Sequence, residues 1–130
     1  MDVLERIRAF IAGFAGYADP EVRRISDEQI RAFVGEALAA LPAVEIEQLE
    51  EQERLYYDRV LLRCEFINQD LFRAFDSGAT AGRIDATLAA DADVVQAAAE
   101  LRKITGATLN GALVRLHDAL DKRDAAMQSA

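Results

Sequence analysis

The sequence predicts an all-α fold, a bundle of five or six helices around one long central helix at about 44–75. Apolar residues recur at intervals of three and four along almost the whole chain, which is the period of an amphipathic helix. No run alternates polar and apolar residues with the period of two that is typical of a half-buried strand. The chain has 130 residues, 52% of them hydrophobic. We therefore expect a single helical domain, 1–130, with a core of its own.

Two helix starts are expected near the N-terminus. Asp2 precedes a helical pattern of apolar residues at 3–14 and is placed to cap its first turn. Further along, Asp19 is followed by Pro20, and proline suits the first position of a helix because its φ angle is already helical. This second start predicts a short helix or turn.

The next helix has the clearest local signal in the chain. The sequence SDEQ at 26–29 fits a capping box, in which Ser26 and Gln29 satisfy each other's free backbone donors. Behind it, apolar residues at helical spacing predict a helix at 27–41. Pro42 should end that helix, because the proline ring clashes with a preceding helical turn.

The long central helix is expected to run from about Val44 to about Phe75. Its end is predicted at DSG, where Gly78 can adopt a positive φ. About 32 residues at 1.5 Å per residue would span roughly 48 Å, which is longer than a domain of this size needs. The helix could bend, break near Asn68 or project beyond its neighbours.

The C-terminal third predicts three helices. The first, at 80–90, has few large apolar residues, and the second, at 91–105, is capped by Asp91 or Asp93. The third, at 108–127, carries apolar residues in alternating steps of four and three, a heptad seam suited to helix–helix packing. The residues of this seam are Leu109, Leu113, Leu116, Leu120 and Met127.

Charge and hydropathy argue against two classes of partner. The net charge is −8, and the only lysines are Lys103 and Lys122, so no basic surface is expected for nucleic acid. No stretch approaches the roughly 18 apolar residues of a membrane span. The N-terminal segment at 1–14 has acids at positions 2 and 5 and no basic region before an apolar run, so it does not fit a signal peptide. We expect a cytoplasmic protein without nucleic-acid or membrane partners.

No catalytic residue, metal ligand set or cofactor motif is predicted. Cys64 is the only cysteine, which excludes an intramolecular disulfide and a thiolate zinc site, and its phase indicates a buried position. His117 is the only histidine and lacks the spacing of a helical metal site. The glutamates at 45–53 suit the positive end of a helix dipole better than a metal. The absence of such motifs favours a protein that is not an enzyme, without settling the point.

The crowded segment RLYYDRVLLRCEF at 54–66 supplies the candidate site. On a helical wheel most of its bulk forms one core face, but Leu55, Leu62 and Phe66 form a second, separate apolar stripe. A thin polar ribbon is expected between the two faces, where charge would be costly unless paired. This ribbon consists of Gln52, Arg59, Arg63 and Asp70.

Two interpretations of this region remain open. In one, the second stripe packs on another helix or on a second copy, and the arginines pair with local acids. In the other, the arginines line a groove for an anionic ligand or an acidic partner segment, since the guanidinium group binds carboxylates in pairs. The candidate binding or interface residues are Leu55, Tyr56, Arg59, Leu62, Arg63, Phe66, Asp70 and His117.

The preferred function is a small non-enzymatic protein–protein interaction module, such as an adaptor, an assembly or secretion chaperone, or a regulatory subunit. A homodimer through the long helix would cover the surplus apolar stripe. The alternative is a ligand-binding bundle or minor enzyme with a pocket for a small anion. That pocket would be built from Tyr56, Tyr57, Arg59, Arg63 and His117. A third possibility, an acidic regulator of a basic partner, rests on charge alone.

Overall fold

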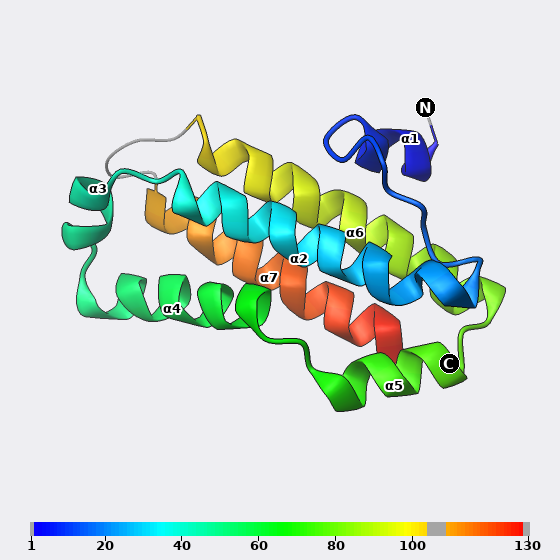
Figure 1. Cartoon of the computed structure of the whole chain (residues 1–130). Coiled ribbons are helices and arrows are strands. Elements are labelled where there is room, and N and C mark those ends of the chain that lie inside the picture. Colours follow the sequence, from blue (N-terminus) through cyan, green and yellow to red (C-terminus); the bar gives the residue numbers. More distant parts are fainter. Residues whose placement is uncertain (1, 104–108, 129–130) are drawn as a thin grey trace.

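The computed structural model describes residues 2–103 and 109–128, and within these ranges the chain is helical and contains no strand (Figure 1). The all-α prediction is therefore confirmed. In chain order the elements are α1 (Val3–Arg8), the 3-10 turn η1 (Pro20–Val22), α2 (Arg23–Ala39), α3 (Ala43–Glu47), α4 (Glu51–Glu65), α5 (Gln69–Ser77), α6 (Ala81–Leu101) and α7 (Leu109–Gln128).

Four of these helices form a closed ring. The α2 helix packs on α4 and α6, and α7 packs on the same two helices from the other side. The α2 and α6 helices run in one direction and α4 and α7 in the other (Figure 1). Because α4 and α6 lie diagonally in the ring, their connection crosses one end of the bundle, and there α5 packs on α7.

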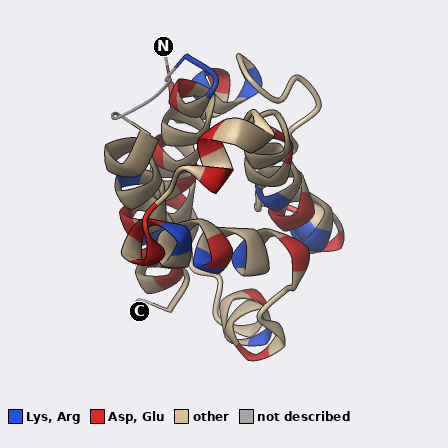
Figure 2. Cartoon of the chain, turned by 90° about the vertical axis from the view of Figure 1, so that its left-hand side faces the viewer, with Lys and Arg blue, Asp and Glu red and all other residues tan. Residues whose placement is uncertain are grey.

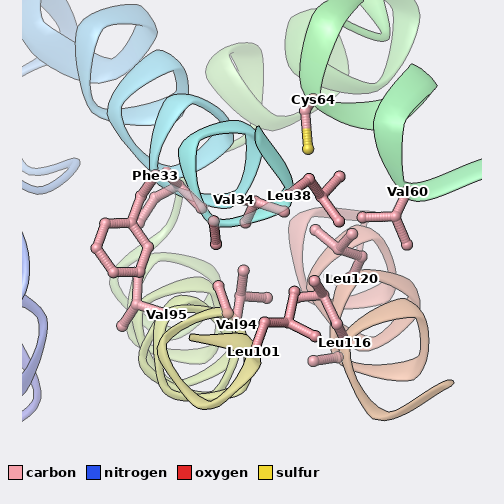
Figure 3. Packing of buried hydrophobic residues seen from close by; sticks show 14 of the residues in the cluster. Phe33, Val34, Leu38, Val60, Cys64, Val94, Val95, Leu101, Leu116 and Leu120 are labelled. Atoms are coloured by element: carbon pink, nitrogen blue, oxygen red, sulfur yellow. The ribbon is translucent and has the colours of Figure 1, made fainter. Parts of the chain in front are cut away.

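The core fills the inside of this ring, where side chains from α2, α4, α6 and α7 meet (Figure 3). The α4 helix contributes Val60 and Cys64, which confirms the buried position predicted for the cysteine. The heptad seam predicted for the last helix is also buried throughout. Its five residues, Leu109, Leu113, Leu116, Leu120 and Met127, are between 0% and 4% exposed.

The single long helix predicted at 44–75 is wrong, because this segment forms the three helices α3, α4 and α5. The second interruption lies near the expected point. Phe66 has extended backbone angles, φ −119° and ψ 123°, and the Asn68 side chain accepts a hydrogen bond from the backbone N–H of Leu71. Asn68 therefore caps α5 and separates it from α4. The periodicity did not reveal the break, because Val60 and Leu71 keep the same helical phase across it.

The two helices predicted at 80–90 and 91–105 are one helix, α6, which Thr80 caps. Asp91 lies in its interior and caps nothing. Residues 104 and 105 of the predicted range lie outside the described residues. Together with the division of 44–75, this gives seven α-helices and one 3-10 turn within the described ranges, where five or six helices were expected.

The predicted helix ends are partly correct. Asp2 and Asp19 cap α1 and η1 as expected, although α1 ends at Arg8. The capping box at 26–29 is wrong, because α2 begins at Arg23, directly after η1. Ser26 lies inside that helix and donates a hydrogen bond to the Gly16 carbonyl, 2.6 Å away. The positive φ expected at Gly78 is also wrong, since its φ is −123°.

Candidate functional site

A buried ion pair joins α6 to α7 at the centre of a polar network. The Arg123 Nε donates to Asp91 Oδ1 over 2.5 Å, and the two residues are 4% and 0% exposed. The same guanidinium donates from Nη2 to Asp27 Oδ1 on α2 over 2.8 Å. One arginine therefore holds two buried carboxylates from two other helices, which meets the requirement that buried charge be paired and hydrogen-bonded.

Tyr17 and Arg31 complete this network. The Tyr17 hydroxyl donates to Asp91 Oδ2 over 2.5 Å and accepts from Arg123 Nη2 over 3.2 Å. The Arg31 Nε donates to Asp27 Oδ2, and its Nη1 reaches the Cys64 carbonyl at the end of α4. The network thus connects the segment before α2 with α2, α4, α6 and α7.

Burial controls the protonation of this network. Loss of solvent raises the pKa of Asp91, while the nearby Arg123 guanidinium and the Tyr17 hydrogen bond oppose that rise. Burial also raises the pKa of Tyr17, and the Asp91 charge adds to the effect. The pKa of Arg123 is raised because Asp91, Tyr17 and Asp27 outweigh its desolvation. Arg123 is hydrogen-bonded to both Asp91 and Asp27, so these charged groups stabilise the contact between helices.

The sequence analysis missed this network, although a signal for Arg123 was present. The heptad seam of α7 runs in steps of four and three, and the step after Leu120 falls on Arg123 before Met127. A charged residue at a seam position needs a buried partner. Asp91 lies on the same buried side of α6 as Val94 and Val95. That Asp91 is the partner of Arg123 follows only from the fold.

A small pocket lies beside this network, where α4 ends. Its volume is about 90 Å³, and it lies between α2, the α4–α5 connection, α5 and α7. Most of the remaining lining is apolar. The charged residues that line it are Asp27, Arg31, Arg63, Arg123 and Asp124.

The five residues from which the sequence analysis built an anion pocket do not line one common pocket in the structure. Of these five residues, Arg63 alone lines the pocket at the end of α4. Tyr56 instead contacts His117 edge-on, with ring centroids 5.1 Å apart. Tyr57 packs against the core and carries the Arg54 guanidinium over its ring. Arg59 is exposed on α4.

The second apolar stripe of α4 lies on the surface. Leu55, Leu62 and Phe66 are 47%, 56% and 66% exposed, so about half or more of each side chain is open to solvent in the described part of the chain. Arg59 lies among them at helical spacing and has no hydrogen-bond or ion-pair partner within residues 2–103 and 109–128. We call these four residues, Leu55, Arg59, Leu62 and Phe66, the exposed α4 face.

The polar ribbon of the sequence analysis is not continuous. Arg63 is half-buried and bridges α4 to α7, with Nη1 2.8 Å from Asp121 Oδ1 and Nη2 2.8 Å from Asp124 Oδ2. Asp70 lies on α5, beyond the break, and its side chain is 96% exposed. Arg63 therefore pairs with local acids, while Arg59 belongs to the exposed α4 face.

His117 lies beside acidic side chains near Arg63. Its Nδ1 is buried without a hydrogen-bond partner in the described residues, 3.6 Å from Asp121 Oδ2 and 3.8 Å from Asp118 Oδ1. Possible ligand atoms of these three residues lie within 4.8 Å of one another. Both aspartates are exposed, and exposed acids commonly gather in this way without an ion. The group therefore carries no metal assignment.

The charged residues are mixed over the helices, and acidic and basic positions lie side by side on the same elements (Figure 2). Among the described residues, no helix is both long enough and apolar enough to cross a membrane. Comparisons with protein-family models, curated proteins and solved structures give no match to this chain.

Proposed function

We propose that this chain is a non-enzymatic protein–protein interaction module whose docking surface is the exposed α4 face and whose partner is a second copy of the chain. The observation that carries the proposal is the exposure of Leu55 and Leu62 on one side of α4 and of Phe66 at its C-cap. Large apolar side chains that gather on a surface are typical of interaction sites. We expect it to act in the cytoplasm.

The spacing of the exposed α4 face suits helix–helix docking. Leu55, Arg59 and Leu62 on α4 and Phe66 at its C-cap follow one another in steps of four, three and four, which is the spacing of a coiled-coil seam. The opposite side of α4 buries Val60 and Cys64 in the core. A second copy can therefore dock on α4 without disturbing the ring of helices.

The acidic edge of the exposed α4 face favours a parallel over an antiparallel second copy. Glu51, Asp58 and Glu65 are exposed and recur every seven residues along one edge of the face, whereas the other edge carries Arg63, whose guanidinium also pairs with Asp121 and Asp124 on α7. In parallel docking of identical helices, the acidic edge of each copy meets the edge of the other copy that carries Arg63. Antiparallel docking would bring the two acidic edges together and is disfavoured.

The contact is expected to be reversible. A helix of 15 residues spans about 22 Å, so the docked area lies at the small end of specific interfaces. Two charged edges and Arg59 also reduce the apolar share of the contact. We expect monomer and dimer to exchange, with dimer favoured at high protein concentration.

Cysteine cross-linking tests both the face and the orientation. Gln52 is exposed and lies one heptad before Arg59 on the same seam. In parallel docking the two copies of residue 52 lie side by side. In antiparallel docking they are more than about 15 Å apart along the axis, beyond the roughly 7 Å between Cα atoms that a disulfide allows.

The experiment uses Gln52→Cys in a Cys64→Ala background, under mild oxidation. A matched control places the cysteine at another exposed glutamine, Gln96→Cys on α6. We expect a disulfide-linked dimer to form much faster from Gln52→Cys than from Gln96→Cys. Equal rates for the two variants would contradict parallel docking through α4.

A further inference from the structure

We propose that Arg59 determines which helix can dock on the exposed α4 face, by pairing with Asp58 of the partner subunit. The inference rests on the proposed function, because this contact exists only when a second copy is docked. It adds to that function the pair of residues that makes the docking selective for a copy of this chain.

The Arg59 guanidinium has no acidic neighbour at the positions of α4 that face it. Side chains on a helix interact when they are three or four residues apart. Around Arg59, these positions hold Leu55, Tyr56, Leu62 and Arg63. Arg59 is exposed and has no hydrogen-bond or ion-pair partner within residues 2–103 and 109–128. Docking of a helix on this face would remove the charge from water, which is costly unless the docked helix supplies an acid.

The spacing of the face shows which residue of a second copy would supply that acid. Arg59 follows Leu55 by four residues and precedes Leu62 by three, so it takes the heptad position a between two leucines at d. In a parallel pair, a side chain at a enters a hole made by the preceding d and g, the a and the next d of the facing helix. For Arg59, the residue at g is Asp58 of the partner subunit. Two leucines and the second copy of Arg59 make up the rest of the hole, so this aspartate is its only acid.

Asp58 can accept from a second guanidinium without losing its present partner. The Arg54 Nε lies 3.2 Å from Asp58 Oδ1, and Oδ2 has no hydrogen-bond partner in the same described ranges. The Asp58 side chain is 52% exposed, which leaves it accessible to a docked copy. Each oxygen of an ionised carboxylate accepts hydrogen bonds, and those from a guanidinium are charge-assisted.

The pair favours a second copy over other apolar helices. An apolar helix without an acid at the position of Asp58 would leave the Arg59 guanidinium unpaired among leucine side chains, and that cost disfavours it as a partner. A second copy supplies the acid twice, once in each hole of the symmetric dimer. A single polar residue at an a position commonly specifies the pairing of helices in this way, at some cost in stability.

Reversing the two charges separately tests the pair. Asp58→Arg and Arg59→Glu each bring like charges together in both holes, so each variant alone should self-associate about tenfold or more weakly than the wild type. In an equimolar mixture, Arg59 of the first variant meets Asp58 of the second, and the two introduced charges are opposite. We expect the mixture to form dimers. The measurement is mass by light scattering after size exclusion, at a concentration where the wild type is dimeric.

The pair Asp70–Arg73 on α5 provides the matched control. Its side chains are 96% and 77% exposed, and Asp70→Arg and Arg73→Glu change the net charge as the two α4 variants do. Each control variant should dimerise alone as the wild type does. Either α4 variant dimerising alone as strongly as the wild type, or a mixture that stays monomeric, would overturn the role of Arg59 while leaving docking of a second copy intact. A wild type that stays monomeric at every concentration would overturn both.

Discussion

Arg123 on α7 and Asp91 on α6 form a buried ion pair, with Nε and Oδ1 2.5 Å apart, at a seam position of α7 between Leu120 and Met127. We expect the pair to favour one alignment of α6 on α7, because an apolar seam alone would tolerate several registers. Buried polar groups at a seam commonly set the register of packed helices.

Replacing this arginine should strongly destabilise the fold. In Arg123→Met the side chain stays long and apolar, but Asp91 and Asp27 are left buried without their shared cation. Loss of one partner of a buried pair costs about 3–5 kcal/mol. We expect the free energy of unfolding in urea to fall by that amount.

The exposed pair Arg54–Asp58 provides the control for this prediction. Its side chains are 49% and 52% exposed, and an exposed pair contributes at most about 1 kcal/mol. Arg54→Met should therefore change the free energy of unfolding by less than this. A cost for Arg123→Met no larger than that for Arg54→Met would contradict the role assigned to the buried network.

The free energy of unfolding should decrease in alkaline solution. Burial raises the pKa of the Cys64 thiol from 9.0 to about 11. The unfolded chain then releases this proton at lower pH than the folded chain does. The thiol's contribution to stability is complete below pH 9.0 and is lost as the pH rises through about 11.

Urea midpoints at several pH values from 8 to 11 would measure this loss. Tyr17, whose pKa burial also raises, adds a decrease of the same sign, so the comparison needs a variant without the thiol. Cys64→Ala should lose less stability than the wild type between pH 8 and 11. Parallel curves for the two proteins would show that the thiol titrates as it does in the unfolded chain.

The cap of α5 should contribute measurably to stability. In Asn68→Ala the backbone N–H of Leu71 loses its side-chain acceptor, 3.1 Å away. Loss of such a cap costs about 1 kcal/mol, whereas aspartate caps a helix as well as asparagine does. We expect a lower free energy of unfolding for Asn68→Ala and almost none of this loss for Asn68→Asp. Equal stability of all three proteins would contradict the capping role.

The fold class could be predicted because it depends on helical periodicity, and the spacing of the apolar residues in the sequence shows that periodicity. The buried seam of α7 and the core position of Cys64 followed from the same pattern. The break between α4 and α5 could not be placed by periodicity, since Val60 and Leu71 keep one phase across it. The break depends on whether residues near Asn68 continue α4 or the Asn68 side chain caps a new helix, and the structure shows the second.

The candidate site was predictable only in part. The second stripe of α4 is a property of one helix, so its separation from the core face was visible in the sequence. Its exposure depends on which other elements could cover it, and that requires the fold. The network of Asp91, Arg123 and Asp27 depends on contacts between residues up to 96 positions apart, which a single sequence does not reveal.

The mass of the chain in solution, measured by light scattering after size exclusion over a range of concentrations, tests docking of a second copy most directly. The wild type should approach twice the 14.3 kDa of one chain as concentration rises. A folded variant with Leu62→Ser and Phe66→Ser should remain at 14.3 kDa. Ile25→Ser, which removes an exposed apolar residue on α2, should behave as the wild type does. A wild type that stays monomeric at every concentration would contradict the account.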